Sequence, residues 1–138
     1  MIEVKQMPYE EMYEKVRDSN RMIAREVPAF ITEQLGNHAA IELQAIWQQG
    51  TKTIPAGASA QEKYEAAYNN WIWMVNNNLR FIQERLGDEG LAKFKRTEVE
   101  ALKKENASPS LIFLNLIRTF SPGTTFRMTA KEFAYQLQ

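Results

Sequence analysis

The chain contains no cysteine, and that absence excludes several kinds of chemistry at once. Disulfides, a thiolate nucleophile and zinc–thiolate sites all require cysteine. The cellular compartment does not follow from it, because many cytoplasmic domains also lack cysteine. Any catalytic or metal-binding role would therefore depend on carboxylates, amides, hydroxyls, amines or imidazole.

Histidine is almost as scarce, since His38 is the only one. A metal site with two histidines cannot form within one chain, and the ferritin-type spacing of a glutamate three residues before a histidine is missing. His38 and Glu42 lie one helical turn apart, which permits a weak metal site or an acid–base pair. The simpler interpretation is a surface histidine near the start of a helix. We expect no metal and no cofactor.

Several further patterns are missing. The sequence has neither a glycine-rich phosphate loop nor a serine in a Gly-x-Ser-x-Gly context. Basic and acidic residues balance at 17 each, which argues against a domain that holds nucleic acid or an anionic membrane by bulk positive charge. No apolar run reaches the length of a membrane span, and the N-terminus is too polar for a signal peptide. We therefore expect a soluble, cytoplasmic protein with no membrane partner.

The most informative feature that is present is a repeated segment. Residues 30–36 read Phe-Ile-Thr-Glu-Gln-Leu-Gly and residues 81–87 read Phe-Ile-Gln-Glu-Arg-Leu-Gly, at an offset of 51 residues. Both copies are typical of a helix that ends at a glycine and is followed at once by another helix. Whether the repeat is a true duplication or only shared helix-end chemistry stays open.

The repeat predicts the organisation of the chain. A length of 138 residues suits one domain with a full core. We expect a single helical domain over residues 1–138, with pseudo-repeat hairpins at about 9–50 and 59–105 and a C-terminal segment over 108–138. The predicted fold class is all-α, with five to six helices in antiparallel helix–Gly–helix hairpins.

Local signals refine the helix ends. The first helix should run from Pro8 to about Glu26, where Pro28 breaks or kinks it before the chain continues helical to Leu35. Asn37 can cap the next helix. Ser59 with Glu62, and Thr129 with Glu132, form capping boxes.

After Ser59, apolar residues recur every three or four positions, which is the spacing of one face of a helix. This pattern predicts one long apolar stripe, made of Tyr64, Tyr68, Trp71, Val75, Leu79, Ile82 and Leu86.

The C-terminal third contains two less regular segments. Residues 111–120 are apolar nearly all round, so this predicted helix is either central in the core or covered by a partner. Residues 124–128 allow a short extended piece before the last helix.

An asparagine-rich stretch is the main local anomaly. Residues 69–78 contain five asparagines, which are poor helix formers, and sequences tend to break local rules where function requires it. At ~100° per residue, Trp71 faces the core and Trp73 the opposite side. The residues predicted around Trp73 on a ligand-binding or protein-binding face are Asn69, Asn76, Asn77 and Arg80. The alternative is a helix buried on two sides, with Trp73 in a second layer and the asparagines binding neighbouring chain ends.

Glu33 and Glu84 are equivalent by the repeat. Two carboxylates that meet across a pseudo-twofold axis can act as an acid–base pair, so they are the candidate catalytic residues. The alternative is that each lies on a solvated face near a helix end.

The C-terminal phrase Phe-Arg-Met-Thr-Ala-Lys-Glu-Phe-Ala, residues 126–134, resembles a segment of the L-2-amino-thiazoline-4-carboxylic acid hydrolase-like family, which has Thr-x-Cys-Pro-Phe-Ala after an all-helical region. Thr129, Phe133 and Ala134 match in spacing, and Lys131 and Glu132 stand where the cysteine and proline would be. The upstream residues that are similar in layout are Leu35, Gly36, Ala40, Glu42 and Trp47. Because the cysteine is missing, the resemblance implies a divergent member with a binding or subunit role, and it transfers no catalytic residue.

Three functions follow as hypotheses. The first is a non-catalytic or catalytically degenerate helical binding or assembly domain, either self-associating or a subunit of a complex with a partner protein. The second is a small-molecule hydrolase-like enzyme with a pocket near Trp71 and Trp73, in which Arg80 binds a carboxylate and a glutamate acts as base. The third, a regulatory or nucleic-acid-binding protein, has the least support because the charge is balanced.

Overall fold

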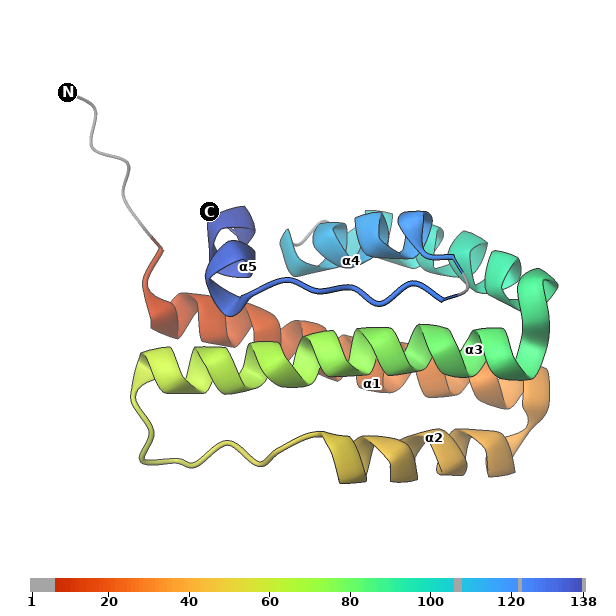
Figure 1. The fold of residues 1–138 in the computed structure, drawn as a ribbon, viewed down its shortest axis with the longest axis horizontal. Coiled ribbons are helices and arrows are strands. Elements are labelled where there is room, and N and C mark those ends of the chain that lie inside the picture. Colours follow the sequence, from red (N-terminus) through yellow and green to blue (C-terminus); the bar gives the residue numbers. More distant parts are fainter. Residues whose placement is uncertain (1–6, 106–107, 122, 138) are drawn as a thin grey trace.

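The protein folds into the helices that the sequence predicts. The computed structural model describes residues 7–105, 108–121 and 123–137, and within these ranges it contains five helices and no strand (Figure 1). The all-α fold class is confirmed. The helices are α1 (Tyr9–Leu35), α2 (Asn37–Gly50), α3 (Ala60–Glu105), α4 (Ser108–Thr119) and α5 (Ala130–Leu137).

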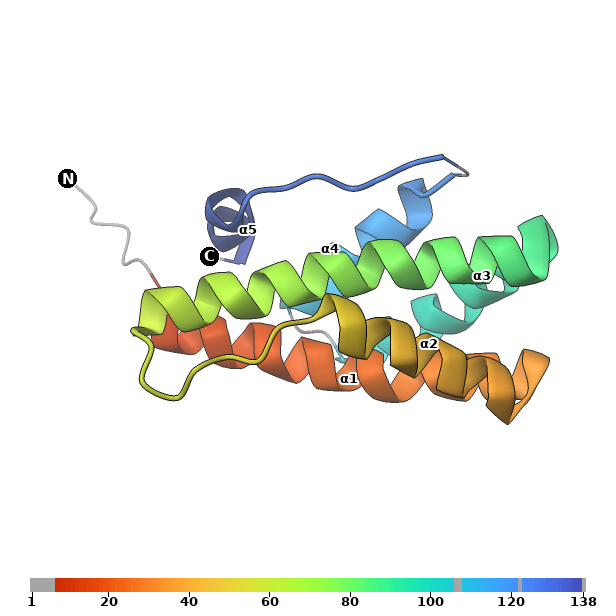
Figure 2. The same ribbon diagram turned by 60° about the horizontal axis from the view of Figure 1, so that its bottom comes forward.

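Two of these helices form the long axis of the molecule. The first half of α3 runs beside α1, and α2 packs on the same pair (Figures 1 and 2). After Gly87 the chain bends, and the second half of α3 returns toward α4 in a further layer. The segment after α4 then runs back along α3 to reach α5.

Gly36 and Gly87 adopt nearly the same backbone conformation. Gly36 has φ 93° and ψ 173°, and Gly87 has φ 67° and ψ −165°. This region of the backbone map is essentially restricted to glycine, because a Cβ atom would clash with the backbone. Each glycine separates two helical segments without a longer loop. The predicted helix–Gly–helix turn is therefore confirmed in both copies of the repeat.

Of the two outcomes expected at Pro28, a break or a kink, the structure excludes the break, and the predicted cap at Asn37 is wrong. Pro28 lies inside α1, which runs uninterrupted from Tyr9 to Leu35. Proline removes one backbone donor, but the neighbouring side chains of Val27 and Phe30 are buried, and that burial offsets the lost hydrogen bond. Asn37 is the first residue of α2 rather than its cap, because Gly36 occupies the cap position.

The two predicted capping residues do bind helix starts. Ser59 Oγ accepts a hydrogen bond from the Glu62 backbone nitrogen at 3.2 Å, and Thr129 Oγ1 accepts one from the Glu132 backbone nitrogen at 3.1 Å. Each bond satisfies a backbone donor that has no partner within its helix. These caps start α3 and α5.

The apolar stripe of α3 forms the centre of the core. Of its seven predicted residues only Leu86 is half-buried, and the other six are buried. α4 contributes Phe113 and Ile117 to the same core and contacts α1, α3 and α5. The interpretation of residues 111–120 as a core helix is therefore correct, although Leu111 stays exposed.

The residues after α4 are held by side chains of α3. Residues 124–129 belong to no helix or strand. Tyr68 donates its hydroxyl to the carbonyl of Met128, and Tyr64 donates to the carbonyl of Ala130 at 2.5 Å. Burial raises the pKa of both tyrosines, so both phenols stay protonated and remain donors. This arrangement fixes the path of the C-terminal segment along α3.

Among the described residues, no helix combines the length and the apolar character needed to cross a lipid bilayer.

Candidate functional site

The asparagine-rich part of α3 forms one wall of a surface groove of about 790 Å³. The opposite wall comes from residues 125–129 and from Glu132 of α5. All five residues predicted for a binding face line this groove, namely Asn69, Trp73, Asn76, Asn77 and Arg80. They meet because residues spaced three and four apart project from one side of a helix. We call this feature the α3 groove.

Trp73 is the largest side chain in the α3 groove, and it is half-buried. Its ring also packs on the end of α2, where a Cβ added to Gly50 would lie 1.8 Å from Trp73 Cζ2. Only glycine leaves room for the indole at that point. Trp73 is therefore fixed on one side by α2 and borders the groove as well.

The side chains of two asparagines form hydrogen bonds with the backbone of neighbouring chain segments. Asn76 Oδ1 accepts from the Phe126 nitrogen at 2.8 Å, and Asn76 Nδ2 donates to the Phe126 carbonyl at 3.0 Å. Asn70 does the same with Lys52, with both distances at 2.9 Å. The side-chain amide of asparagine has a carbonyl acceptor and an N–H donor, as a peptide group has. Each side chain therefore forms the two hydrogen bonds that a neighbouring β-strand would form. These asparagines position loops, as the alternative interpretation expected.

The other asparagines differ in their partners. Asn77 Nδ2 donates to the Trp73 carbonyl at 2.8 Å, within the helix. Asn78 is buried and accepts a hydrogen bond from Trp47 Nε1 at 2.7 Å. Asn69 is exposed, and among the described residues its side chain has no hydrogen-bond partner. Asn69 is thus the asparagine of the groove whose amide remains entirely available.

The charged residues of the α3 groove are Arg80, Arg127 and Glu132, all of them exposed. Within the part of the chain that the structure describes, neither arginine forms an ion pair or a side-chain hydrogen bond. Two unpaired guanidinium groups therefore border a groove that also contains an indole. Guanidinium groups bind carboxylates through paired N–H donors.

The sequence did not single out Arg127 and Met128 for this site. They are about fifty residues from Asn76 along the chain, and they reach the groove because Asn76 and Tyr68 bind the backbone of their segment. No local pattern in residues 124–129 indicates that contact, so the sequence alone gave no signal for it.

Trp71 does not share the pocket of Trp73, which corrects the predicted pocket near both. Trp71 is fully buried, and its Nε1 donates to Ser19 Oγ at 2.9 Å. Its ring packs against Phe113 and Phe133. Residues two apart on a helix point about 200° apart around its axis, so they face opposite sides.

Glu33 is near the end of α1, and Glu84 precedes Gly87 in α3. Both are exposed, and among the described residues no hydrogen bond links them. Glu84 lines a small hollow of about 320 Å³ with Arg80, and Glu33 is not part of it. The hollow beside Glu84 therefore contains one of the two predicted carboxylates, and their role as an acid–base pair stays a prediction.

His38 is exposed near the start of α2. Its predicted partner Glu42 accepts a hydrogen bond from Arg85 of α3 instead. In residues 7–105, 108–121 and 123–137, no group of three or more histidine, aspartate or glutamate side chains is placed to hold a metal ion. In this part of the chain, His38 and Glu42 are therefore not part of a group of three or more side chains that could bind a metal ion.

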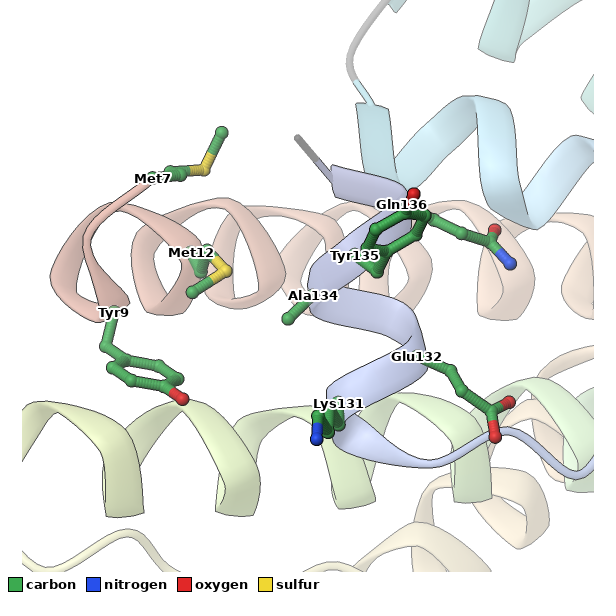
Figure 3. Close-up of a pocket in the computed structure, with 8 residues that line it drawn as sticks. All are labelled: Met7, Tyr9, Met12, Lys131, Glu132, Ala134, Tyr135 and Gln136. Carbon is green, nitrogen blue, oxygen red and sulfur yellow. The ribbon is translucent and has the colours of Figure 1, made fainter. Parts of the chain in front are cut away.

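A second hollow, of about 570 Å³, lies between the start of α1 and α5. Figure 3 shows Met12 of α1 and Ala134 of α5 pointing into the space between the two helices. Tyr9 and Tyr135 are on its rim, and Tyr135 is 82% exposed. This hollow is also lined by Lys131, Glu132 and Gln136, so it too combines apolar and polar side chains.

No protein-family model matches the chain, and neither the curated proteins nor the solved structures give a significant match. The class of the protein is therefore defined by its fold, an all-α helical bundle. The resemblance of residues 126–134 to the hydrolase-like family stays a prediction.

Proposed function

We propose that this protein is a non-catalytic helical binding domain that holds a segment of a partner polypeptide in the α3 groove. The observation that supports it is the combination of a fixed, half-buried Trp73 with two unpaired arginines, Arg80 and Arg127, along one groove. Aromatic and arginine side chains contribute most of the binding energy at protein interfaces.

The chemistry of the groove favours a particular kind of segment. Trp73, Ile72 and Met128 offer apolar surface, and the two arginines offer donors for a carboxylate. The matching segment carries an acidic side chain beside an aromatic or aliphatic one. Because Asn69, Arg80 and Arg127 are exposed, the groove is accessible from the side to an extended chain.

A hydrolytic role has less support. Glu33 does not line the hollow that contains Glu84, Trp71 is in the core, and Lys131 stands where the resembling family has its cysteine. A hydrolase would require a general base beside a bound substrate.

A selection from a random peptide library tests the proposal. We expect the protein to enrich peptides with aspartate or glutamate next to an aromatic residue. The double variant Arg80→Glu, Arg127→Glu should bind the selected peptides at least ~10-fold more weakly, since it removes two charge-assisted contacts. The double variant Arg96→Glu, Arg118→Glu changes two exposed arginines outside the groove by the same charge and should bind normally.

The chain has three tryptophans, and their indole N–H resonances report on different places. Trp73 borders the α3 groove and Trp71 is in the core. Selected peptides should shift the Trp73 resonance and leave Trp71 unchanged. Absence of any enrichment, or equal binding by both double variants, would show that the groove does not bind peptides in this way.

A second copy of the chain is one polypeptide that the groove can hold. Sedimentation equilibrium distinguishes this case. A dimer that dissociates when Trp73→Ala is introduced identifies the partner as a second copy. A monomer that still binds selected peptides identifies it as a different chain.

A further inference from the structure

The segment between α4 and α5 passes along α3 in an extended conformation. Asn76 bonds both the nitrogen and the carbonyl of Phe126, at 2.8 Å and 3.0 Å, which requires these two backbone groups to point the same way. The two groups of one residue do so in a β-strand. Exposure alternates as well, since Thr125 and Arg127 are exposed and Phe126 between them is half-buried. Residues 125–127 therefore have the geometry of a single strand.

One edge of this segment is occupied by side chains of α3. Asn76 binds the backbone of Phe126, and the hydroxyl of Tyr68 donates to the carbonyl of Met128. Because Phe126 and Met128 are two residues apart in an extended chain, their backbone groups lie on the same edge. The edge that faces α3 is thus satisfied within the protein.

The opposite edge belongs to Thr125 and Arg127. Within residues 7–105, 108–121 and 123–137, the backbone nitrogen and carbonyl of these two residues have no hydrogen-bond partner. Figure 2 shows the segment at the upper margin of the molecule, with α3 below it and no helix above it. Backbone groups without a protein partner normally face water. We call this feature, with its two donors and two acceptors at the spacing of a β-ladder, the free edge.

The charge beside the free edge is positive. Arg127 is exposed, and in the described part of the chain its side chain forms no ion pair or hydrogen bond. In an added strand, the side chain directly opposite Arg127 lies on the same face, where an acidic group is favourable. A second copy of the segment fits poorly, because antiparallel pairing of two free edges puts two Arg127 side chains opposite or diagonal to each other.

We propose that the free edge binds an extended segment of a partner polypeptide as an added β-strand, with an acidic side chain opposite Arg127. Thr125 and Arg127 each donate their N–H to the added strand and accept from it at their carbonyl. The backbone hydrogen bonds contribute affinity, and the carboxylate that contacts Arg127 sets the register. The free edge is on the side of the segment away from α3, so this inference does not depend on binding in the α3 groove.

The test uses the acetylated and amidated peptide Thr-Val-Glu-Val-Thr, whose glutamate can lie opposite Arg127. Its binding to the unaltered protein should slow the hydrogen exchange of the Thr125 and Arg127 amides, because they gain acceptors. The Phe126 amide should not change, since Asn76 already binds it.

Two N-methylated forms of this peptide have the same mass and charge. N-methylation of the glutamate removes a donor to the free edge and should weaken binding at least ~10-fold. N-methylation of the valine that follows it alters a donor on the other edge of the added strand and should have little effect.

Charge reversal tests the carboxylate contact. A peptide with lysine in place of the glutamate should bind at least ~10-fold more weakly, and Arg127→Glu should weaken the original peptide to the same degree. Arg127→Glu with the lysine peptide should restore binding, which a misfolded variant would not do. Arg80→Glu is the matched control, because it reverses an exposed arginine that lines the α3 groove and is not on the free edge. It should bind as the unaltered protein does.

The exchange rates of Thr125 and Arg127 distinguish the outcomes. Unchanged exchange with the peptide would overturn the proposal, as would equal losses from the two N-methylated forms. A dimer that protects both amides before any peptide is added would overturn it too, because a second copy would then occupy the free edge. A shift of the Trp73 resonance without slower exchange at Thr125 would assign the peptide to the α3 groove and refute the added strand.

Discussion

Asn76 pairs with both backbone groups of Phe126, accepting from its nitrogen at 2.8 Å and donating to its carbonyl at 3.0 Å. This single side chain connects the middle of α3 to the segment between α4 and α5. It gives a reason for one of the five asparagines in residues 69–78. The lower helix propensity of asparagine is offset by tertiary hydrogen bonds.

Removing this pair should loosen the C-terminal segment. Asn76→Ala leaves two partly buried backbone groups without partners, so the free energy of unfolding should fall by ~1–3 kcal/mol. Amide exchange at Phe126 should become faster. Asn69→Ala also replaces an asparagine of α3 by the better helix former alanine, but it removes no hydrogen bond. It should therefore change the free energy of unfolding by less than ~0.5 kcal/mol. Equal urea midpoints for the two variants would contradict the prediction.

The two glycines of the repeat should be equally intolerant of substitution. Gly36→Ala and Gly87→Ala force alanine into a conformation at φ 93° or φ 67°, which costs ~1–3 kcal/mol each. A Cβ meets nothing within 4 Å at either site, so the loss is due to the backbone alone. Gly57→Ala also has open space but no positive φ, and it should be neutral or slightly stabilising. Urea unfolding measures all three, and a neutral result at Gly36 and Gly87 would refute the prediction.

Trp47 and Asn78 should show energetic coupling. Asn78→Val leaves the buried indole N–H of Trp47 without an acceptor and should destabilise the protein by ~1–3 kcal/mol. When Trp47→Phe is already present there is no N–H to satisfy, so Asn78→Val should cost less. A double-mutant cycle of unfolding free energies should therefore give a coupling of at least ~0.5 kcal/mol. Simple additivity would mean that the hydrogen bond contributes nothing measurable.

Glu98 should make stability depend on pH. This carboxyl group is 2% exposed, and burial, assisted by the nearby charge of Glu26, raises its pKa to about 7. The unfolded chain has a pKa of ~4.3 for glutamate. Between these two values the folded state binds the proton and the unfolded state does not, so the free energy of unfolding falls as the pH rises from ~4.3 to about 7.

Glu98→Gln isolates this effect. Glutamine is neutral at every pH, so the variant should be more stable than the unaltered protein by up to ~3 kcal/mol at pH ~8 and nearly equal at pH ~4. Glu100→Gln alters an exposed carboxylate on the same helix and should show no comparable pH dependence. Thermal or urea unfolding across this range measures the difference. A constant difference between Glu98→Gln and the unaltered protein would rule out the buried carboxylate as its cause.

The local architecture follows from signals within short stretches of the sequence. Glycine at positions 36 and 87 ends one helical segment and begins the next, and Ser59 and Thr129 cap helix starts. These signals act within one or two turns, so their physical basis is contained in neighbouring residues. The absence of a break at Pro28 shows the limit of local rules, because burial of the surrounding side chains outweighs the loss of one hydrogen bond.

Which distant residues contact one another depends on how the helices pack. The face around Trp73 follows from helical spacing, but the presence of Arg127 there depends on the contact of Asn76 with a residue 50 positions away. The free edge of residues 125–127 likewise depends on Asn76 and Tyr68, which bind the other edge of that segment from α3. Such contacts depend on the path of the whole chain, which the pattern of any one segment does not contain.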